Sequence, residues 1–166
     1  MIRGKAWKFG DDISTDLITA GRYYHLRSNM NELVKHIFED ADINFAKEVL
    51  KREQVYIVVG GRNFGKGSSR EHAARLIKMV SPAVLAKSFA RIFYRNCFNL
   101  GLPALIVDTD KIEHGDELEI DLAKGRVRNL TKNYELNFSP IPESLQKILQ
   151  EGGIIEYIKK YRDIKF

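Results

Sequence analysis

Three continuous apolar runs in the middle of the chain predict strands that are buried on both faces, since a half-exposed strand would alternate instead. These runs are residues 55–59, 83–86 and 103–107. Between them, apolar residues recur at helical spacing over 69–80 and 89–100. The resulting strand–helix–strand–helix–strand order predicts right-handed crossovers and a parallel sheet with helices on its faces.

Segments on both sides of this core predict additional strands and helices. Residues 2–9 alternate like a strand, and so do three segments after the core, which predict an antiparallel hairpin or meander. Further short helices are predicted, and the polar stretch 10–29 is too long for an ordinary connection, which is typical of functional or mobile loops. The alternating segments after the core are 117–122, 126–130 and 134–138, and the helices are 30–38, 45–50, 142–150 and 154–161.

Together these elements predict an α/β fold with a mostly parallel central sheet, flanking helices and an added antiparallel hairpin. At 166 residues, the chain is long enough for one domain with a proper core and short for two. We therefore expect residues 1–166 to form a single domain.

Composition narrows the function classes. A hydrophobic fraction of 44% and a charged fraction of 30% are typical of a soluble globular protein. No apolar run approaches the ~20 residues that span a membrane, and the N-terminus lacks the apolar region of a signal peptide, so we expect a cytoplasmic protein without a membrane partner. The net charge of +5 is spread along the chain among 22 acidic residues, with one tight basic cluster at 159–162. This distribution does not favour nucleic-acid binding.

The single cysteine limits metal and redox chemistry. Cys97 excludes an internal disulfide, and one thiolate cannot by itself hold an iron–sulfur cluster or a structural zinc. It lies within an apolar run, so we expect a buried and inert thiol. We therefore predict no metal site on this chain.

Candidate chemistry concentrates in "FGKGSSREHAARL", residues 64–76, directly after the first buried strand. Residues 60–66 match the glycine and lysine positions of a P-loop, but Gly67 follows where Ser or Thr would hold magnesium, which disfavours a nucleotide site. A structural interpretation is a capping box, with Ser68 as N-cap and Glu71 three residues later. That interpretation does not account for Arg70 or for the paired glycines.

A carboxylate site is the alternative interpretation of the same stretch. Free N–H groups and the positive dipole end at a helix N-terminus favour anions. Glycines let the backbone approach a ligand, and Arg70 could bind a carboxylate bidentately. A serine hydroxyl among such donors would be stabilised as an alkoxide and could act as a base. Capping and catalysis are compatible if one serine caps and the other points outward.

Four motifs carry a resemblance to a known family: "WKFGDDISTDLI" (7–18), "GGRNFGKGSSREHAA" (60–74), "AKSFARIFYRNCFNLGLP" (86–103) and "EGGIIEYIKK" (151–160). With these, the chain resembles the small subunit of the isopropylmalate isomerase and homoaconitase group, which corresponds to the mobile fourth domain of aconitase. The motifs run in family order from nearly one end of the chain to the other.

The resemblance implies a swivelling β/β/α domain and a hydro-lyase activity. It implies that 2- and 3-isopropylmalate are interconverted by dehydration and rehydration, a step of leucine biosynthesis. In the family, a 4Fe–4S cluster binds the hydroxyl and a carboxylate of this small hydroxy-carboxylic acid. The cluster belongs to a separate large subunit, so the resemblance implies a heterodimer or heterotetramer in which this chain supplies half of the active site.

The resemblance also assigns roles to individual residues. Ser68 matches the catalytic serine, whose alkoxide removes a proton from carbon, and backbone N–H groups around Gly67 to Arg70 would stabilise it. Gly67 is also expected among the substrate-binding residues. Ser69 and Arg70 match residues that bind a substrate carboxylate. Asp16 matches an aspartate that orients a histidine of the other subunit. The alternative interpretation is that Asp16 only stabilises a turn.

Substrate choice is implied to depend on "GRYYHLRSN", residues 21–29. Arg27 matches, across a one-residue gap, an arginine that aconitase uses for a carboxylate, and lies in a Leu-Arg-Ser version of a homoaconitase pattern. The extra His25 and the missing proline after Thr19 depart from the family and could leave Arg27 in solvent. A homoaconitase-type substrate is therefore the alternative to isopropylmalate. A non-catalytic anion-binding module is the alternative of another class.

Overall fold

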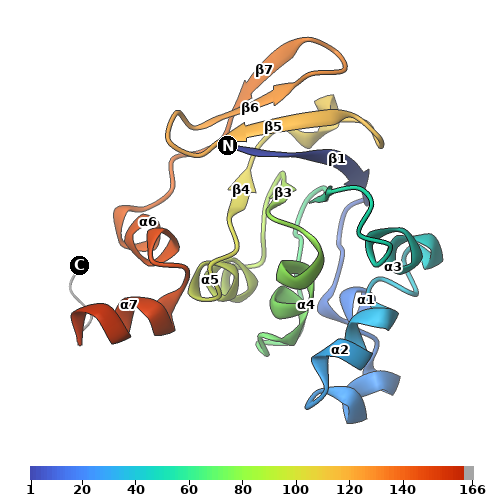
Figure 1. The fold of residues 1–166 in the computed structure, drawn as a ribbon. Helices are drawn as coiled ribbons and strands as arrows, with labels where there is room; N and C mark the ends of the chain where they lie inside the picture. The colour runs from blue at the N-terminus through green and yellow to red at the C-terminus, as the bar shows by residue number, and fades with distance from the viewer. Residues whose placement is uncertain (163–166) are drawn as a thin grey trace.

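The computed structural model describes residues 1–162 and contains one seven-stranded sheet of order β4-β3-β2-β1-β5-β6-β7 (Figure 1). Strands β1 to β4 run parallel to one another, and β5 to β7 continue the sheet in antiparallel fashion beyond β1. The predicted mixed sheet is thereby confirmed. The strands are β1 (Ile2–Lys8), β2 (Tyr56–Val59), β3 (Val84–Ala86), β4 (Ala104–Ile106), β5 (Glu117–Asp121), β6 (Arg126–Asn129) and β7 (Tyr134–Asn137).

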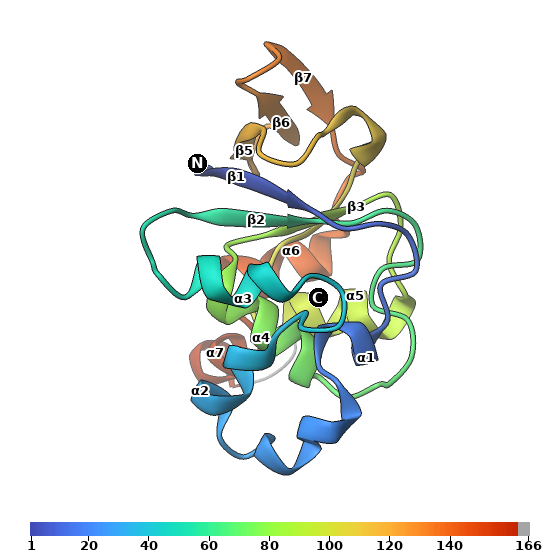
Figure 2. The same ribbon diagram turned by 90° about the vertical axis from the view of Figure 1, so that its right-hand side faces the viewer.

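The α-helices lie together on one side of the parallel strands (Figure 1). This follows from the strand order, because right-handed crossovers between consecutive neighbouring strands all pass over the same face. The antiparallel strands stand on the opposite side of β1 to β3 (Figure 2). Helices thus cover one face and strands the other, which explains why β2 and β3 consist almost entirely of buried apolar residues. This is the β/β/α layering that the family resemblance implied.

The helices differ from the predicted ones mainly at their starts. The segment 30–38 divides into an α-helix and a 3₁₀-helix. The 3₁₀-helix ends before Phe38, whose backbone is in the left-handed region at φ 55°. Gly101, at φ 75°, follows the C-cap residue of α5. The helices are α1 (Thr15–Ile18), η1 (Gly21–Leu26), α2 (Met30–Leu33), η2 (Val34–His36), α3 (Ile43–Val49), α4 (His72–Val80), α5 (Arg91–Asn99), η3 (Thr109–Lys111), α6 (Glu143–Gln150) and α7 (Ile154–Tyr161).

The long segment 10–29 is more ordered than its sequence indicates, since α1 and η1 lie within it. Ser14 caps α1 by accepting a hydrogen bond from the N–H of Leu17 at 3.2 Å. Thr15 and Ile18 of α1 are buried, and the helix thereby holds this segment on the core. Among the described residues, no helix has the length and apolarity needed to cross a membrane.

Candidate functional site

The loop after β2 is held against the start of α1 by backbone hydrogen bonds. The N–H of Gly65 donates to the carbonyl of Ile13 at 2.7 Å, and the N–H of Thr15 donates to the carbonyl of Lys66 at 2.8 Å. Gly65 and Gly67 have φ of 86° and 116°, which side-chain-bearing residues rarely adopt. The two glycines therefore shape the loop, and the loop brings two segments distant in sequence together.

Ser68 is fixed by two hydrogen bonds at the point where these segments meet. Its N–H donates to Oγ1 of the buried Thr15 at 3.0 Å. Its Oγ accepts a hydrogen bond from the N–H of Arg70 at 3.2 Å. The side chain itself is exposed, so the hydroxyl is oriented by the protein and still open to a ligand.

The predicted capping box is wrong. Helix α4 begins at His72 with Glu71 as its N-cap residue, three residues later than expected, and no side chain caps it. The Ser68 hydroxyl already binds the nearby N–H of Arg70, and the Glu71 carboxylate pairs with Arg75 one turn later. No side chain caps α5 either, and the hydroxyl of Ser88, two residues before its N-cap, accepts a hydrogen bond from the N–H of Asn63 at 2.8 Å.

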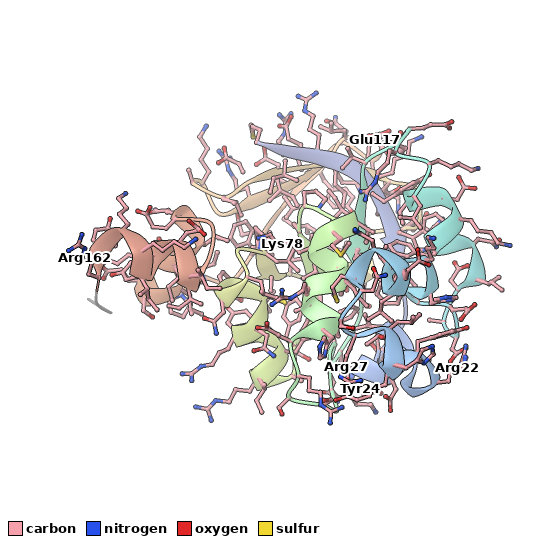
Figure 3. The ribbon with its side chains drawn as sticks, turned by 60° about the horizontal axis from the view of Figure 1, so that its bottom comes forward. Arg22, Tyr24, Arg27, Lys78, Glu117 and Arg162 are labelled. Atoms are coloured by element: carbon pink, nitrogen blue, oxygen red, sulfur yellow. The ribbon has the colours of Figure 1, made fainter. Side chains whose placement is uncertain are left out.

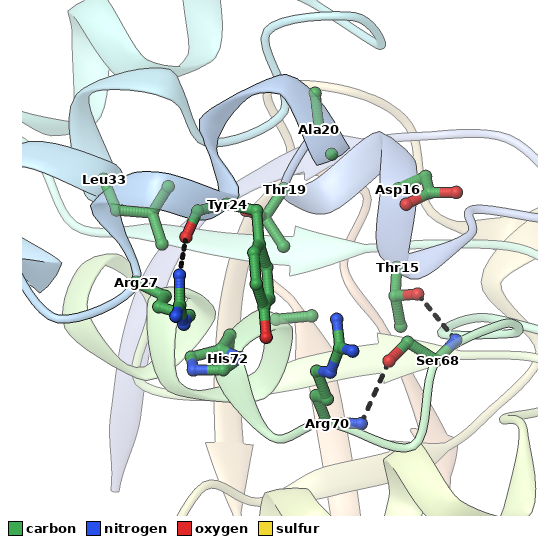
Figure 4. Close-up of a pocket in the computed structure, with 12 residues that line it drawn as sticks. Thr15, Asp16, Thr19, Ala20, Tyr24, Arg27, Leu33, Ser68, Arg70 and His72 are labelled. Atoms are coloured by element: carbon green, nitrogen blue, oxygen red, sulfur yellow. Dashed lines mark hydrogen bonds between the residues drawn. The ribbon is translucent and has the colours of Figure 1, made fainter.

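A pocket of about 80 Å³ opens beside Ser68 (Figure 4). Three segments line it, namely α1 with its following residues, η1 to α2, and the loop leading into α4. It contains four of the predicted site residues, Asp16, Arg27, Ser68 and Arg70. The complete lining is Thr15, Asp16, Thr19, Ala20, Gly21, Tyr24, Arg27, Leu33, Ser68, Arg70, His72 and Ala73.

Two further predicted residues lie in the loop but outside this lining. The carbonyl of Ser69 accepts a hydrogen bond from the side-chain amide of Asn96 on α5 at 3.1 Å, which ties the loop to a second helix. Gly67 precedes Ser68, and a Cβ at this position would lie 2.9 Å from Oγ1 of Thr15. Gly67 thus permits the close approach of the loop to α1. Substrate binding by either residue stays a prediction.

Positive charge dominates the pocket. Within residues 1–162, no carboxylate pairs with either Arg27 or Arg70, although other arginines of the chain do form ion pairs. Both guanidiniums instead lie over the ring of Tyr24, with Cζ-to-centroid distances of 4.2 and 4.6 Å. Asp16 is the one carboxylate in the lining. The pocket therefore suits an anionic ligand.

The pocket residues that sequence reasoning missed include Thr15, Tyr24 and His72. His72 had a visible signal in its position one turn after the serines, and its ring meets that of Tyr24 edge-on at 6.5 Å. Thr15 lies next to the predicted Asp16 in the sequence. However, its hydrogen bond with Ser68 joins residues that are 53 positions apart. No local pattern reveals that contact.

The single cysteine of the chain is buried in the core. Cys97 is fully buried, and this burial raises the pKa of its thiol far above the usual range. Among the described residues, no group of three or more histidine, cysteine or acidic side chains is placed to hold a metal ion.

The fold and this pocket define the class of the protein as an aconitase C-terminal domain, a family that matches residues 8–109. A protein of Archaeoglobus fulgidus named 3-isopropylmalate dehydratase small subunit 2 is 61% identical over 163 residues, covering 98% of this chain and 97% of that protein. A Thermotoga maritima protein named 3-isopropylmalate dehydratase small subunit 1 is 57% identical, with 97% and 96% covered.

A solved structure agrees with these relatives. The crystal structure of a 3-isopropylmalate dehydratase from Methanocaldococcus jannaschii superposes with a TM-score of 0.91 at 43% identity, covering 97% of this chain and 95% of that one. The chain thus belongs to the family of 3-isopropylmalate dehydratase small subunits. The resemblance noted from the four motifs is confirmed.

Proposed function

We propose that this chain is the small subunit of a hydro-lyase that interconverts 2- and 3-isopropylmalate in leucine biosynthesis, together with a large iron–sulfur subunit in the cytoplasm. The observation that carries the proposal is the pocket itself. An oriented serine hydroxyl and two guanidiniums without carboxylate partners in residues 1–162 line one cavity. The names of the relatives, which cover nearly the whole chain, supply the substrate class.

In this proposal, Ser68 is the base that removes a proton from the carbon beside a carboxylate. A hydrogen on such a carbon is weakly acidic, so the base must be strong and yet stabilised before it reacts. The N–H of Arg70, which donates to Oγ of Ser68 at 3.2 Å, favours the ionised oxygen over the protonated one. The bond from the N–H of Ser68 to Thr15 holds the backbone from which the hydroxyl projects.

Arg70 binds a substrate carboxylate in the proposal, and Ser69 assists it. The guanidinium of Arg70 lies in the same pocket as the Ser68 hydroxyl, on the same short loop (Figure 4). A bidentate pair would place the carbon next to the bound carboxylate close to the base. Asp16, exposed in the lining, is free to orient a residue that enters from a partner.

The exposure of the site supports a partner. Ser68, Arg70 and Asp16 are all exposed, whereas proton abstraction from carbon requires a site that excludes water. A large subunit that covers the pocket would provide this exclusion. A 4Fe–4S cluster on that subunit would supply a Lewis acid for the hydroxyl that leaves. This chain's contribution is then the base, the carboxylate-binding residues and Asp16.

The position of Arg27 favours a second candidate substrate. Arg27 lines the pocket instead of projecting away from it, so a substituent with a carboxylate, as in homocitrate-type substrates, would find a cation there. However, Arg27 already donates to the carbonyl of Tyr24 at 3.1 Å and stacks on the ring of that residue. These contacts of the Arg27 guanidinium reduce the free-energy cost of placing an isopropyl group beside it. Isopropylmalate therefore remains the first candidate.

A substrate panel tests the proposal. We expect the complex with the large subunit to turn over 3-isopropylmalate faster than homoisocitrate or isocitrate. The Arg27→Leu variant should retain activity on isopropylmalate and lose any activity on substrates with a third carboxylate. A wild-type complex that prefers a tricarboxylate would overturn the first candidate in favour of the second. An unchanged preference in Arg27→Leu would show that Arg27 does not contact the third substituent.

A further inference from the structure

Tyr24 connects the two guanidiniums of the pocket. Its ring lies between Arg27 and Arg70, which approach it from opposite sides in Figure 4. The Cζ atoms of Arg27 and Arg70 lie 4.2 and 4.6 Å from the ring centroid. A third member of the site, His72, meets the ring edge-on. The ring of Tyr24 thus contacts side chains from two segments that are distant in sequence.

Core packing does not explain this position. Tyr24 is 42% exposed, and the 3₁₀-helix η1 that carries it has no buried residue. In Figure 3, Tyr24 lies beside Arg27, and Arg22 lies apart from both. The neighbouring Tyr23 behaves differently, because its ring stacks at 3.8 Å on His36, which is not part of the pocket lining. The ring contacts of Tyr24 therefore serve the pocket rather than the core.

Stacking on an aromatic face leaves a guanidinium able to bind a carboxylate. The attraction between a cation and a ring uses the flat face of the guanidinium, while its N–H groups point outward in its own plane. A carboxylate binds to that N–H edge. Both arginines can therefore keep their contact with Tyr24 and bind an anion at the same time.

We propose that Tyr24 is a positioning residue that holds Arg27 and Arg70 at a fixed separation and presents their N–H edges to the substrate. The inference rests on the proposed function, because it assumes that the anion is the carboxylate-bearing substrate. It deepens that function by assigning the preorganisation of the substrate-binding arginines to one aromatic ring. Tyr24 also joins the segment proposed to contact the third substituent to the loop that carries the base.

The size of the effect follows from the freedom that the ring removes. An arginine without its ring contact samples several rotamers, and binding must then immobilise it, which weakens affinity by roughly two- to tenfold for each side chain. Because Arg70 is the arginine proposed to bind a carboxylate of isopropylmalate, the loss of the ring should raise KM for that substrate by about two- to tenfold. Ser68 does not contact Tyr24, so kcat should change less than twofold or so.

The kinetic test compares three variants in the complex with the large subunit. Tyr24→Leu should raise KM as stated, and Tyr24→Phe, which keeps the ring, should restore the wild-type KM. The matched control is Tyr161→Leu, because Tyr161 is 41% exposed and carries the ammonium of Lys160 at 5.2 Å from its ring, yet lies on α7 and is absent from the pocket lining. This control should leave KM unchanged. Equal KM values for wild type and Tyr24→Leu would overturn the inference.

A second measurement does not depend on activity. In the full chain, ring currents should move the side-chain protons of Arg27 and Arg70 upfield in NMR spectra, and Tyr24→Leu should abolish both shifts while Tyr24→Phe keeps them. Their absence from the wild-type spectrum would overturn the inference. A wild-type complex that turns over no hydroxy acid would contradict the proposed function, and the NMR spectra would still decide whether the ring holds both arginines.

Discussion

Replacing Gly67 by alanine tests whether the glycine-shaped loop sets the position of the base. Gly67 has φ of 116°, and a Cβ there would lie 2.9 Å from Oγ1 of Thr15. That oxygen accepts the hydrogen bond donated by the N–H of Ser68. Since ordinary contacts of a Cβ exceed about 3.4 Å, Thr15 must give way by a few tenths of an ångström. The hydrogen bond that fixes Ser68 would then lengthen or break.

The expected magnitudes separate stability from catalysis. A side chain in such a backbone conformation costs about 1–3 kcal/mol, and the lower entropy of the unfolded alanine chain offsets roughly 0.4–1 kcal/mol of it. We therefore expect the free energy of unfolding to fall by about 1–2 kcal/mol. Displacement of a reacting group by about 1 Å can cost 100-fold in rate, so a smaller shift of Ser68 should lower kcat by roughly 10-fold.

The assay measures urea unfolding of the chain and kcat of the complex for Gly67→Ala and for a control, Gly125→Ala. Gly125 also has a positive φ, of 67°, but a Cβ there meets no atom within 4 Å and the residue lies in the turn between β5 and β6. The control should lose about 1 kcal/mol of stability and keep its kcat. A normal kcat in Gly67→Ala, or an equal loss of kcat in both variants, would refute the reasoning.

Two further predictions concern hydrogen-bonded side chains. Thr15→Val should lower kcat by several-fold, because it removes the hydroxyl that accepts the hydrogen bond from Ser68. Thr15→Ser keeps a hydroxyl and should retain the wild-type kcat. Equal kcat values for Thr15→Val and Thr15→Ser would contradict the role of the hydroxyl. Burial opposes ionisation of Asp116, but the N–H of Glu113, the amide of Asn129 and the charge of Lys132 together lower its pKa. A lowered pKa stabilises the fold above about pH 4, and this contribution is lost as acid protonates the carboxylate. Unfolding free energies should therefore fall less steeply below about pH 4 in Asp116→Asn than in wild type, and parallel curves would contradict the prediction.

The sheet could be predicted from the sequence because its signal is local. A continuous apolar run such as 55–59 is typical of a strand covered on both faces, and it contrasts with the alternating segments near both ends of the chain. The placement of β1 between β2 and β5 was not predicted, since strand pairing depends on contacts between residues far apart in sequence. The same strand order places all the crossover helices on one face, which the element order alone did not reveal.

Four of the predicted site residues line the pocket, and the errors in the predicted local structure have identifiable causes. Helix α4 starts later than predicted, and the two residues of the predicted capping box have other partners. The Ser68 hydroxyl binds the N–H of Arg70, and the Glu71 carboxylate pairs with Arg75. Tyr23 and Tyr24 are chemically identical neighbours, and only the folded η1 decides which ring contacts His36 and Arg22 and which contacts Arg27 and Arg70. Three of the four predicted residues that line the pocket, Asp16, Ser68 and Arg70, come from motifs shared with the family, whereas Arg27 comes from segment 21–29, which departs from the family pattern.

The most direct test of the central claim is kcat of Ser68→Ala beside Ser69→Ala in the complex with the large subunit. Loss of a positioned base should lower kcat by about 100- to 10,000-fold for Ser68→Ala. Ser69→Ala should act mainly on KM, because Ser69 is proposed to bind a carboxylate. The two chains should unfold at similar temperatures. A Ser68→Ala complex that turns over isopropylmalate at nearly the wild-type rate would contradict the claim and favour an anion-binding module without catalysis.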